Sequence, residues 1–273
     1  MFIVDSQVHI WKDVMLNKTH RQVETYSKDD LLAEMATAGV DAVLLHPPGS
    51  WPGGNALAEA AAVAHPERFA VLGYFDLGDG PQPETVARWT ERPGQIGLRF
   101  NFMQEHMRSW PTDGTVDWVW PEIEKAGIPV GLLAHDFLPR CSWIAETHPG
   151  MRLLIDHMGV APTRKDADAF ANLSDLLALA KFSNVAVKLS GAPSNSSDVY
   201  PYRNLHDYMQ RIFDAFGPDR CFWGTDLSRM PCSYRECVTM FTEELPWLTG
   251  RDLELVMGEA LCNWVGWHPK GID

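Results

Sequence analysis

Short apolar runs rich in β-forming residues recur along this chain and alternate with stretches of helical pattern. The eight runs cover residues 2–9, 41–46, 69–76, 96–100, 129–135, 152–157, 184–190 and 221–226. Their near-continuous apolar character indicates strands that are buried on both faces, which is typical of a parallel sheet covered by helices. Eight such units close naturally into a (β/α)8 TIM barrel, and we predict this fold.

Helix signals fill the intervals between these strands. Ser27, with Asp30 three residues later, resembles a capping box, and Gly39 marks the end of that helix. Asn55 is expected to open an alanine-rich helix that ends near His65. The other predicted helices are 83–90, 116–127, 142–148, 166–182, 202–217, 234–245 and 252–265. An open doubly wound sheet is the alternative, but no G-x-G-x-x-G follows any strand.

The sequence shows no domain boundary, so we predict a single domain over residues 1–273. Two longer irregular stretches, 101–115 and 191–201, follow the fourth and seventh strands. In a barrel they would lie at the carboxyl ends of the strands, where substrate loops are found.

Charge and composition exclude several kinds of partner. With 23 Lys and Arg against 36 Asp and Glu, the net charge of −13 disfavours binding to nucleic acid or an anionic membrane. The longest apolar runs are far shorter than the roughly 20 residues of a membrane helix. Five scattered cysteines without a C-x-x-C pair suit a reducing compartment, so a soluble, cytoplasmic protein is expected. The oligomeric state stays open, a homo-oligomer included.

The first strand carries polar side chains toward its carboxyl end. If the strand is regular, Asp5, Gln7, His9 and Trp11 share one face, because side chains alternate along a strand. Other strand ends contribute polar residues as well. They are His46, Asp76, Arg99, His135, Asp156, His157, Lys188, Ser190 and Asp226.

A closed barrel would bring these strand ends to one volume. A single strand-end histidine is more often structural, but several converging ones favour a functional site. We predict that His9, His135 and Asp226 hold a divalent metal, Zn²⁺ or Mn²⁺, with an open position for water. His157 would act as general acid or base, and Asp226 would take a proton from the attacking water.

Two basic residues stand among the strand ends of an otherwise acidic chain. Arg99 and Lys188 are predicted to bind an anionic oxygen or a carboxylate of a small substrate. The alternative for each is a salt bridge inside the barrel mouth.

Five short motifs, in order along almost the whole chain, resemble a known family. They are Asp5-x-x-x-His9-x-Trp11, Asp156-His157-Met158-Gly159, Lys188-Leu189-Ser190-Gly191, Trp223-Gly224-Thr225-Asp226 and Gly258-Glu259-Ala260-Leu261-Cys262-Asn263-Trp264. Together they resemble the amidohydrolase superfamily, in its amidohydrolase-related branch of lactonases and nonoxidative decarboxylases. The resemblance implies a TIM barrel with its site at the strand ends.

Strand one departs from the pattern of that family, which usually carries His-x-His with both imidazoles on the metal. Here the first position is Gln7, a neutral and weaker ligand for zinc-like ions. The branch includes lactonases that work without metal, in which strand-end His and Arg residues polarise the lactone carbonyl and the strand-eight Asp activates water. The resemblance therefore supports a hydrolytic or lyase site more strongly than a bound ion, and Gln7 joins Arg99 and Lys188 as a substrate-binding candidate.

Three functions remain in view. The first is a hydrolase of a small, carboxylated substrate, specifically a lactonase that uses Asp226 to activate water. The second is a metal-dependent nonoxidative decarboxylase or hydratase on the same scaffold. The third is a non-catalytic metabolite-binding barrel that has lost its first metal ligand at Gln7.

Overall fold

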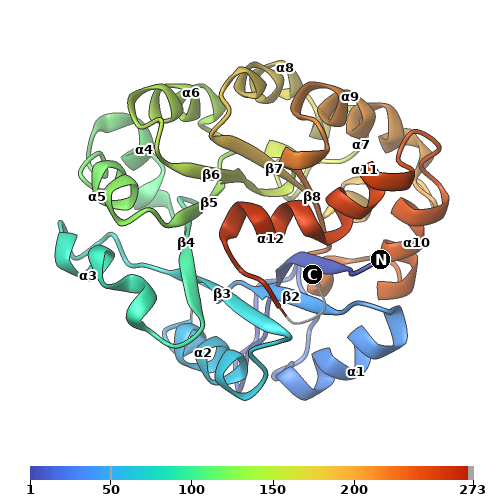
Figure 1. The fold of residues 1–273 in the computed structure, drawn as a ribbon, viewed down its shortest axis with the longest axis horizontal. Helices are drawn as coiled ribbons and strands as arrows, with labels where there is room; N and C mark the ends of the chain where they lie inside the picture. Colours follow the sequence, from blue (N-terminus) through green and yellow to red (C-terminus); the bar gives the residue numbers. More distant parts are fainter. Residues whose placement is uncertain (50, 270–273) are drawn as a thin grey trace.

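The computed structural model describes residues 1–49 and 51–269 and contains one sheet of eight parallel strands. Neighbouring strands in sequence are neighbours in the sheet throughout, from β1 to β8. The strands are β1 (Val4–Val8), β2 (Ala42–Leu45), β3 (Phe69–Tyr74), β4 (Gln95–Asn101), β5 (Pro129–Leu133), β6 (Arg152–Ile155), β7 (Val185–Ser190) and β8 (Cys221–Gly224). Helices lie between the strands around the outside, so the predicted (β/α)8 barrel is confirmed (Figure 1).

The α-helices of the described residues are short and differ in length. They are α1 (Lys28–Ala38), α2 (Gly54–Ala64), α3 (Pro83–Ala87), α4 (Trp110–Asp113), α5 (Val119–Ala126), α6 (Leu138–Thr147), α7 (Asp166–Ala169), α8 (Leu173–Leu177), α9 (His206–Phe216), α10 (Tyr234–Glu243), α11 (Gly250–Glu254) and α12 (Ala260–Val265). The predicted capping box at Ser27 and Asp30 is present, and Gly39 ends α1 at φ 78°. Asn55 does not cap α2. Its side chain instead bonds the backbone N–H and C=O of Tyr74 and so ties α2 to β3.

One predicted helix is broken. The single helix expected over 166–182 is divided into α7, α8 and a 3-10 turn at Ala178–Lys181. The break falls at Asn172, whose C=O accepts from Leu176 N–H while its side chain donates to the C=O of His135. A side chain that bonds backbone outside its own helix competes with helix continuation. The helix predicted over 252–265 is likewise interrupted, by a π-helical turn at Leu255–Glu259.

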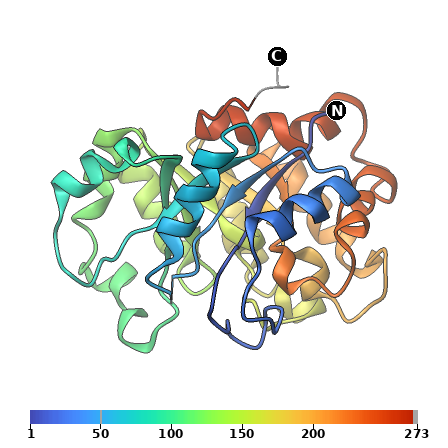
Figure 2. The same ribbon diagram turned by 90° about the horizontal axis from the view of Figure 1, so that it is seen from below.

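Apolar side chains fill the amino-terminal end of the barrel. Ala42, Leu44, Leu72, Leu154 and Phe222 pack together with residues of α12. That helix lies across the barrel opening, on the side of the molecule where the chain begins (Figure 1). The long loop after β1 lies at the opposite end (Figure 2). The strands are parallel, so their polar carboxyl ends all lie at the opposite end of the barrel.

A β-bulge in β1 alters the predicted face of that strand. Asp5 pairs with Val43 and Val8 pairs with Leu45, so three steps along β1 match two along β2. Gln7 points into the barrel, whereas Asp5 bonds the hydroxyl groups of Thr225 (2.5 Å) and Tyr234 (2.9 Å) on the helix side. The expectation that Asp5 shares a face with Gln7 and His9 is therefore wrong, because it assumed a regular strand. Burial raises the pKa of Asp5 to about 6.

Hydrogen bonds join the end of β8 to β1. Asp226 N–H donates to the C=O of Gln7 at 2.8 Å, and Thr225 N–H donates to the Asp5 carboxylate at 2.9 Å. Gly224 lies so close that a Cβ there would collide with the Ser6 hydroxyl. These contacts place Asp226 next to the end of β1.

Over residues 1–49 and 51–269, none of the helices combines the length and the apolar character needed to cross a bilayer.

Candidate active site

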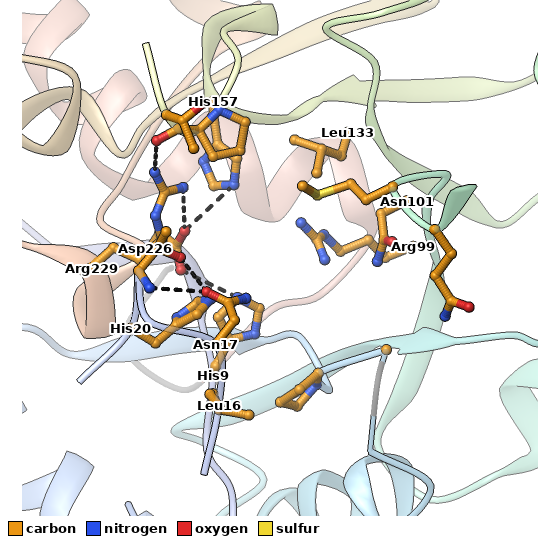
Figure 3. Close-up of a pocket in the computed structure, with 17 residues that line it drawn as sticks. His9, Leu16, Asn17, His20, Arg99, Asn101, Leu133, His157, Asp226 and Arg229 are labelled. Atoms are coloured by element: carbon orange, nitrogen blue, oxygen red, sulfur yellow. Dashed lines mark hydrogen bonds and ion pairs between the residues drawn. The ribbon is translucent and has the colours of Figure 1, made fainter. Parts of the chain in front are cut away.

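A cavity of about 470 Å³ opens at the carboxyl ends of the strands. Histidine, arginine and amide side chains make up much of its wall, with Asp226 as its carboxylate (Figure 3). The lining residues are His9, Leu16, Asn17, Thr19, His20, Pro48, Gly49, Arg99, Asn101, Met103, Gln104, Leu133, His157, Pro162, Thr163, Asp226 and Arg229. Of the predicted site residues, the structure therefore brings His9, Arg99, His157 and Asp226 together.

Asp226 is the centre of this group. Its Oδ1 lies 3.2 Å from His9 Nε2, and its Oδ2 lies 3.2 Å from Arg229 Nη1 and 3.7 Å from His157 Nε2. Burial raises the pKa of this carboxyl, but the hydrogen bond from His9 and the charges of its neighbours outweigh burial and hold the pKa well below its usual value. Asp226 is thus an ionised carboxylate although only 2% of its surface is exposed.

The backbone is strained at both predicted catalytic residues. Asp226 has φ 57° and His157 has φ 51°, in the left-handed region that non-glycine residues rarely adopt. Such conformations cost about 1–3 kcal/mol each and persist only where the surrounding structure imposes them. Each is the second residue after a strand, and the left-handed turn directs its side chain across the barrel mouth.

His157 is held as a neutral ring. Its Nδ1 lies 2.9 Å from Ser190 Oγ, and a Cβ on Gly191 would come within 3.2 Å of the same nitrogen. Burial lowers the pKa of His157 to about 4, although Asp226 acts in the opposite direction. When the Ser190 hydroxyl donates to Nδ1, the ring proton lies on Nε2, which faces Asp226 and the cavity.

Both ring nitrogens of His9 face acceptors. Nδ1 lies 2.5 Å from the C=O of His46, and Nε2 lies 3.2 Å from the Asp226 carboxylate. These two contacts fix the ring of His9, which in turn orients the Asp226 carboxylate.

Lys188 and Gln7 lie beneath the cavity and do not line it. Both are fully buried, and Lys188 Nζ donates to Gln7 Oε1 at 3.0 Å. The same ammonium group is 2.9 Å from Asp156 Oδ1, and Arg99 Nε donates to Asp156 Oδ2 at 2.7 Å. Burial raises the pKa of Asp156, but the adjacent cations outweigh it and keep the pKa well below its usual value. Only Arg99 of this network reaches the cavity wall.

His135 is not brought to Asp226. It is half-buried, its Nε2 lies 3.2 Å from the neighbouring Asp136, and it does not line the cavity. The predicted ligand set of His9, His135 and Asp226 is therefore not assembled around one point. β5 ends at Leu133, and His135 lies in the following turn. His157 and Asp226 also lie two residues beyond their strands, but both have positive φ angles, which His135 does not have.

Three important cavity residues are absent from the set predicted from sequence. Arg229 follows Asp226 by three residues, donates to the C=O of Pro162 at 2.7 Å and pairs with Asp226. His20 and Asn17 come from the loop between β1 and α1. Arg229 could have been found as a cation just after a strand-end carboxylate. The loop residues carried no local signal, because their position depends on how the loop folds over the barrel.

The buried histidines predict how stability depends on pH. Burial lowers the pKa of His20 to about 4, as it does for His157, whereas both rings bind a proton near pH 6.5 in the unfolded chain. Between these values the unfolded state holds more protons, so the free energy of unfolding falls as pH falls. Asp5, with its pKa of about 6, has the opposite effect on the free energy of unfolding, but it is one group against two histidines. We expect a lower Tm at pH 5 than at pH 7 in thermal unfolding.

The variant His20→Gln identifies one source of that pH dependence. It removes one of the buried rings that must be protonated on unfolding, so the drop in Tm between pH 7 and pH 5 becomes smaller. An unchanged drop would show that His20 titrates normally in the folded protein.

The sequence profile described as Amidohydrolase matches residues 4–271. The protein belongs to the amidohydrolase family. The resemblance inferred from the motifs is thereby confirmed. Family membership supports an enzyme, as does the likeness to a curated lactonase.

Known proteins similar to this chain include lactonase-type and zinc-containing members. The chain is 26% identical over 167 residues to L-fucono-1,5-lactonase of Burkholderia ambifaria, covering 58% of this chain and 54% of that protein. The match thus spans about half the length of that curated relative. A Burkholderia multivorans amidohydrolase structure with bound zinc has a TM-score of 0.81 and 19% identity, over 98% of this chain and 100% of the other.

A third similar protein is a Pseudomonas putida structure named as a 2-pyrone-4,6-dicarboxylic acid hydrolase, a name that is marked as provisional. It has a TM-score of 0.75 and 22% identity, over 98% of each chain. At these identities the structural likenesses show the fold alone.

The donor set of this chain does not fit a resident divalent ion. Within residues 1–49 and 51–269, no group of three or more His, Cys, Asp or Glu side chains is placed to hold one. The Arg229 guanidinium already neutralises Asp226, and the Lys188 ammonium already occupies Gln7 Oε1. A second cation beside these groups would be repelled.

Proposed function

We propose that this amidohydrolase is a lactonase that opens the ring of a small, carboxylated lactone with a water molecule activated by Asp226. The observation that carries the proposal is the buried, ionised Asp226 carboxylate in a cavity whose opposite wall presents Arg99 (Figure 3). A base and a cation on opposite sides of one cavity are what hydrolysis of an ester carbonyl requires. The lactonase relative supports the same reaction class.

The first step of this mechanism forms the bond between water and the carbonyl carbon. Asp226 accepts one proton of the water as its oxygen attacks, and His9 holds the carboxylate in place through Nε2. The electron pair of the carbonyl bond moves to the carbonyl oxygen. Arg99 and the Nε2–H of His157 stabilise the resulting negative charge, since both line the cavity.

The second step breaks the ring. The oxyanion returns its electron pair to re-form the carbonyl, and the bond between the carbonyl carbon and the ring oxygen is cleaved. The proton held by Asp226 passes to the ring oxygen, which becomes a hydroxyl group. One water molecule is consumed, the product is a hydroxy acid, and Asp226 is again ionised.

Cavity size and charge support a small, anionic substrate. A volume of about 470 Å³ is at the lower end of the range for small-molecule sites. Arg99 and Arg229 both line it, and guanidinium groups bind carboxylates well. One arginine beside the reacting carbonyl and the other beside a substrate carboxylate would fix the orientation of the ring.

A lactone panel tests the proposal. The purified protein is incubated with five- and six-membered sugar lactones and with carboxylated lactones, and acid release is followed with a pH indicator. We expect ring opening of at least one member, with the hydroxy acid as product by mass spectrometry. Release of CO2 from carboxylated aromatic acids, with no lactone opened, would contradict the proposal and favour the decarboxylase alternative.

Metal removal is a separate prediction. Because Arg229 and Lys188 already occupy the relevant oxygen atoms, we expect less than about 0.1 equivalent of zinc or manganese in protein purified without added metal. We also expect kcat/KM to be unchanged after dialysis against a strong chelator. Stoichiometric metal together with activity lost on chelation and restored by Zn²⁺ would overturn this assignment.

A further inference from the structure

Beneath the cavity, Lys188, Asp156, Gln7 and Arg99 form a buried network with more contacts than a single salt bridge. Lys188 Nζ has three neighbours: Gln7 Oε1 at 3.0 Å, Asp156 Oδ1 at 2.9 Å and His46 Nε2 at 3.2 Å. Lys188, Asp156 and Gln7 are each 0% exposed. Burying an ammonium group costs free energy, and an aliphatic side chain of similar size at this position would avoid that cost. The charge therefore calls for a functional reason.

Asp156 shares its two oxygen atoms between two cations. Oδ1 faces Lys188, and Oδ2 accepts from Nε of Arg99. Arginine and carboxylate commonly form a two-pronged pair in which two guanidinium nitrogens bond both oxygens. Here the ammonium group of Lys188 holds the second oxygen, so the guanidinium is attached through Nε.

This attachment leaves the terminal nitrogens of Arg99 available. Among residues 1–49 and 51–269, neither Nη1 nor Nη2 of Arg99 has a protein partner within hydrogen-bond distance. The guanidinium reaches into the cavity opposite Asp226 and Arg229 (Figure 3). Gly131 on the adjacent strand lies against the network: a Cβ there would be in ordinary van der Waals contact, at 3.5 Å, with both Arg99 Cγ and Asp156 Oδ1.

We propose that Lys188 is a positioning residue that occupies one oxygen of Asp156 and thereby keeps both terminal amino groups of Arg99 directed at the substrate carbonyl. Without it, Arg99 would take both oxygens of Asp156 and withdraw from the cavity. Lys188 thus acts through Arg99 and does not touch the substrate. The inference rests on the proposed function only for the role of Arg99, because the arrangement of the three side chains can be observed without a substrate.

The test replaces Lys188 with methionine, which has a similar length and no charge. We expect Lys188→Met to lower kcat/KM by about tenfold, mostly through kcat, because a shift of the order of 1 Å in a positioned group costs that much or more. Lys181→Met, at an exposed lysine, is the matched control and keeps the parent activity. Circular dichroism and thermal unfolding establish that the compared proteins are folded. A loss in Lys188→Met smaller than about threefold overturns the proposal.

A second variant separates positioning from a purely structural role. In Lys188→Met/Asp156→Asn the amide offers a single acceptor oxygen, so Arg99 cannot be drawn into a two-pronged pair. We expect this double variant to be more active than Lys188→Met, although more of the network has been removed. Activity equal to or below that of the single variant overturns the proposal, because a structural or substrate-binding lysine predicts an added loss.

If Lys188→Met does not fold, the charge-balanced double variant decides alone. A kcat/KM within about tenfold of the parent then supports positioning, and a larger loss overturns it. Crystal structures of the variants give a readout that needs no substrate: we expect Arg99 to bond both oxygens of Asp156 in Lys188→Met. Failure to open any lactone would refute the proposed function and leave this structural result to decide the role of Lys188.

Discussion

Asp226→Asn is expected to lower kcat by about 10³-fold, because the amide oxygen cannot take a proton from water at neutral pH. The substitution keeps the size of the side chain. Asparagine also tolerates the left-handed backbone that Asp226 adopts at φ 57°, so the turn after β8 is expected to keep its conformation. KM should change little, since the water and not the substrate loses its partner. Steady-state kinetics on the lactone identified in the panel measure both constants.

Asp76→Asn is the matched control for this variant. Asp76 also follows a strand, β3, but is exposed and bonds only the N–H of Gly78 within the described chain. We expect it to retain parent activity. If Asp226→Asn keeps parent kcat/KM, Asp226 is not the base and the proposed mechanism is wrong.

Arg99→Met is expected to lower kcat by about 10²-fold, the usual cost of removing one donor that stabilises a developing oxyanion. The fold should survive, because Asp156 keeps its ion pair with Lys188 at 2.9 Å and no buried charge is left alone. Thermal unfolding checks the fold, and kcat on the same lactone measures the loss.

The matched control is Arg92→Met, which removes a guanidinium that pairs with Glu59 away from the cavity. We expect no change in kcat. If Arg99→Met raises KM alone and leaves kcat intact, Arg99 binds a substrate carboxylate equally in the ground state and the transition state, and His157 would be the main oxyanion donor.

Several features were predictable from sequence because they depend on local pattern. The eight strands followed from apolar runs of strand length, and the start and end of α1 followed from Ser27, Asp30 and Gly39. Of the strand-end residues predicted to converge, His9, Arg99, His157 and Asp226 line one cavity, whereas His135 does not. This convergence could be predicted because the carboxyl ends of the parallel strands of a barrel lie together, so a residue at a strand end has a known place in the fold.

Other features depend on contacts between distant segments. The bulge in β1 turns Asp5 away from Gln7, and it arises from pairing with β2 and from the approach of Thr225. His135 lies as far beyond its strand as His157 and Asp226 do, but it lacks their left-handed backbone conformation and does not line the cavity. His20 enters the cavity from a loop whose course no local pattern specifies.

The sequence by itself determined the barrel, the order of its strands and which strand ends carry chemistry, because periodicity and strand-end position are local properties. Only the tertiary structure decided how charge is divided among those residues. It pairs Arg229 with Asp226, places Lys188 below the cavity and leaves Arg99 exposed to it. The physical reason is that an ion pair forms between whichever charges the fold brings within a few ångströms, and that choice is not written in the spacing of residues along the chain.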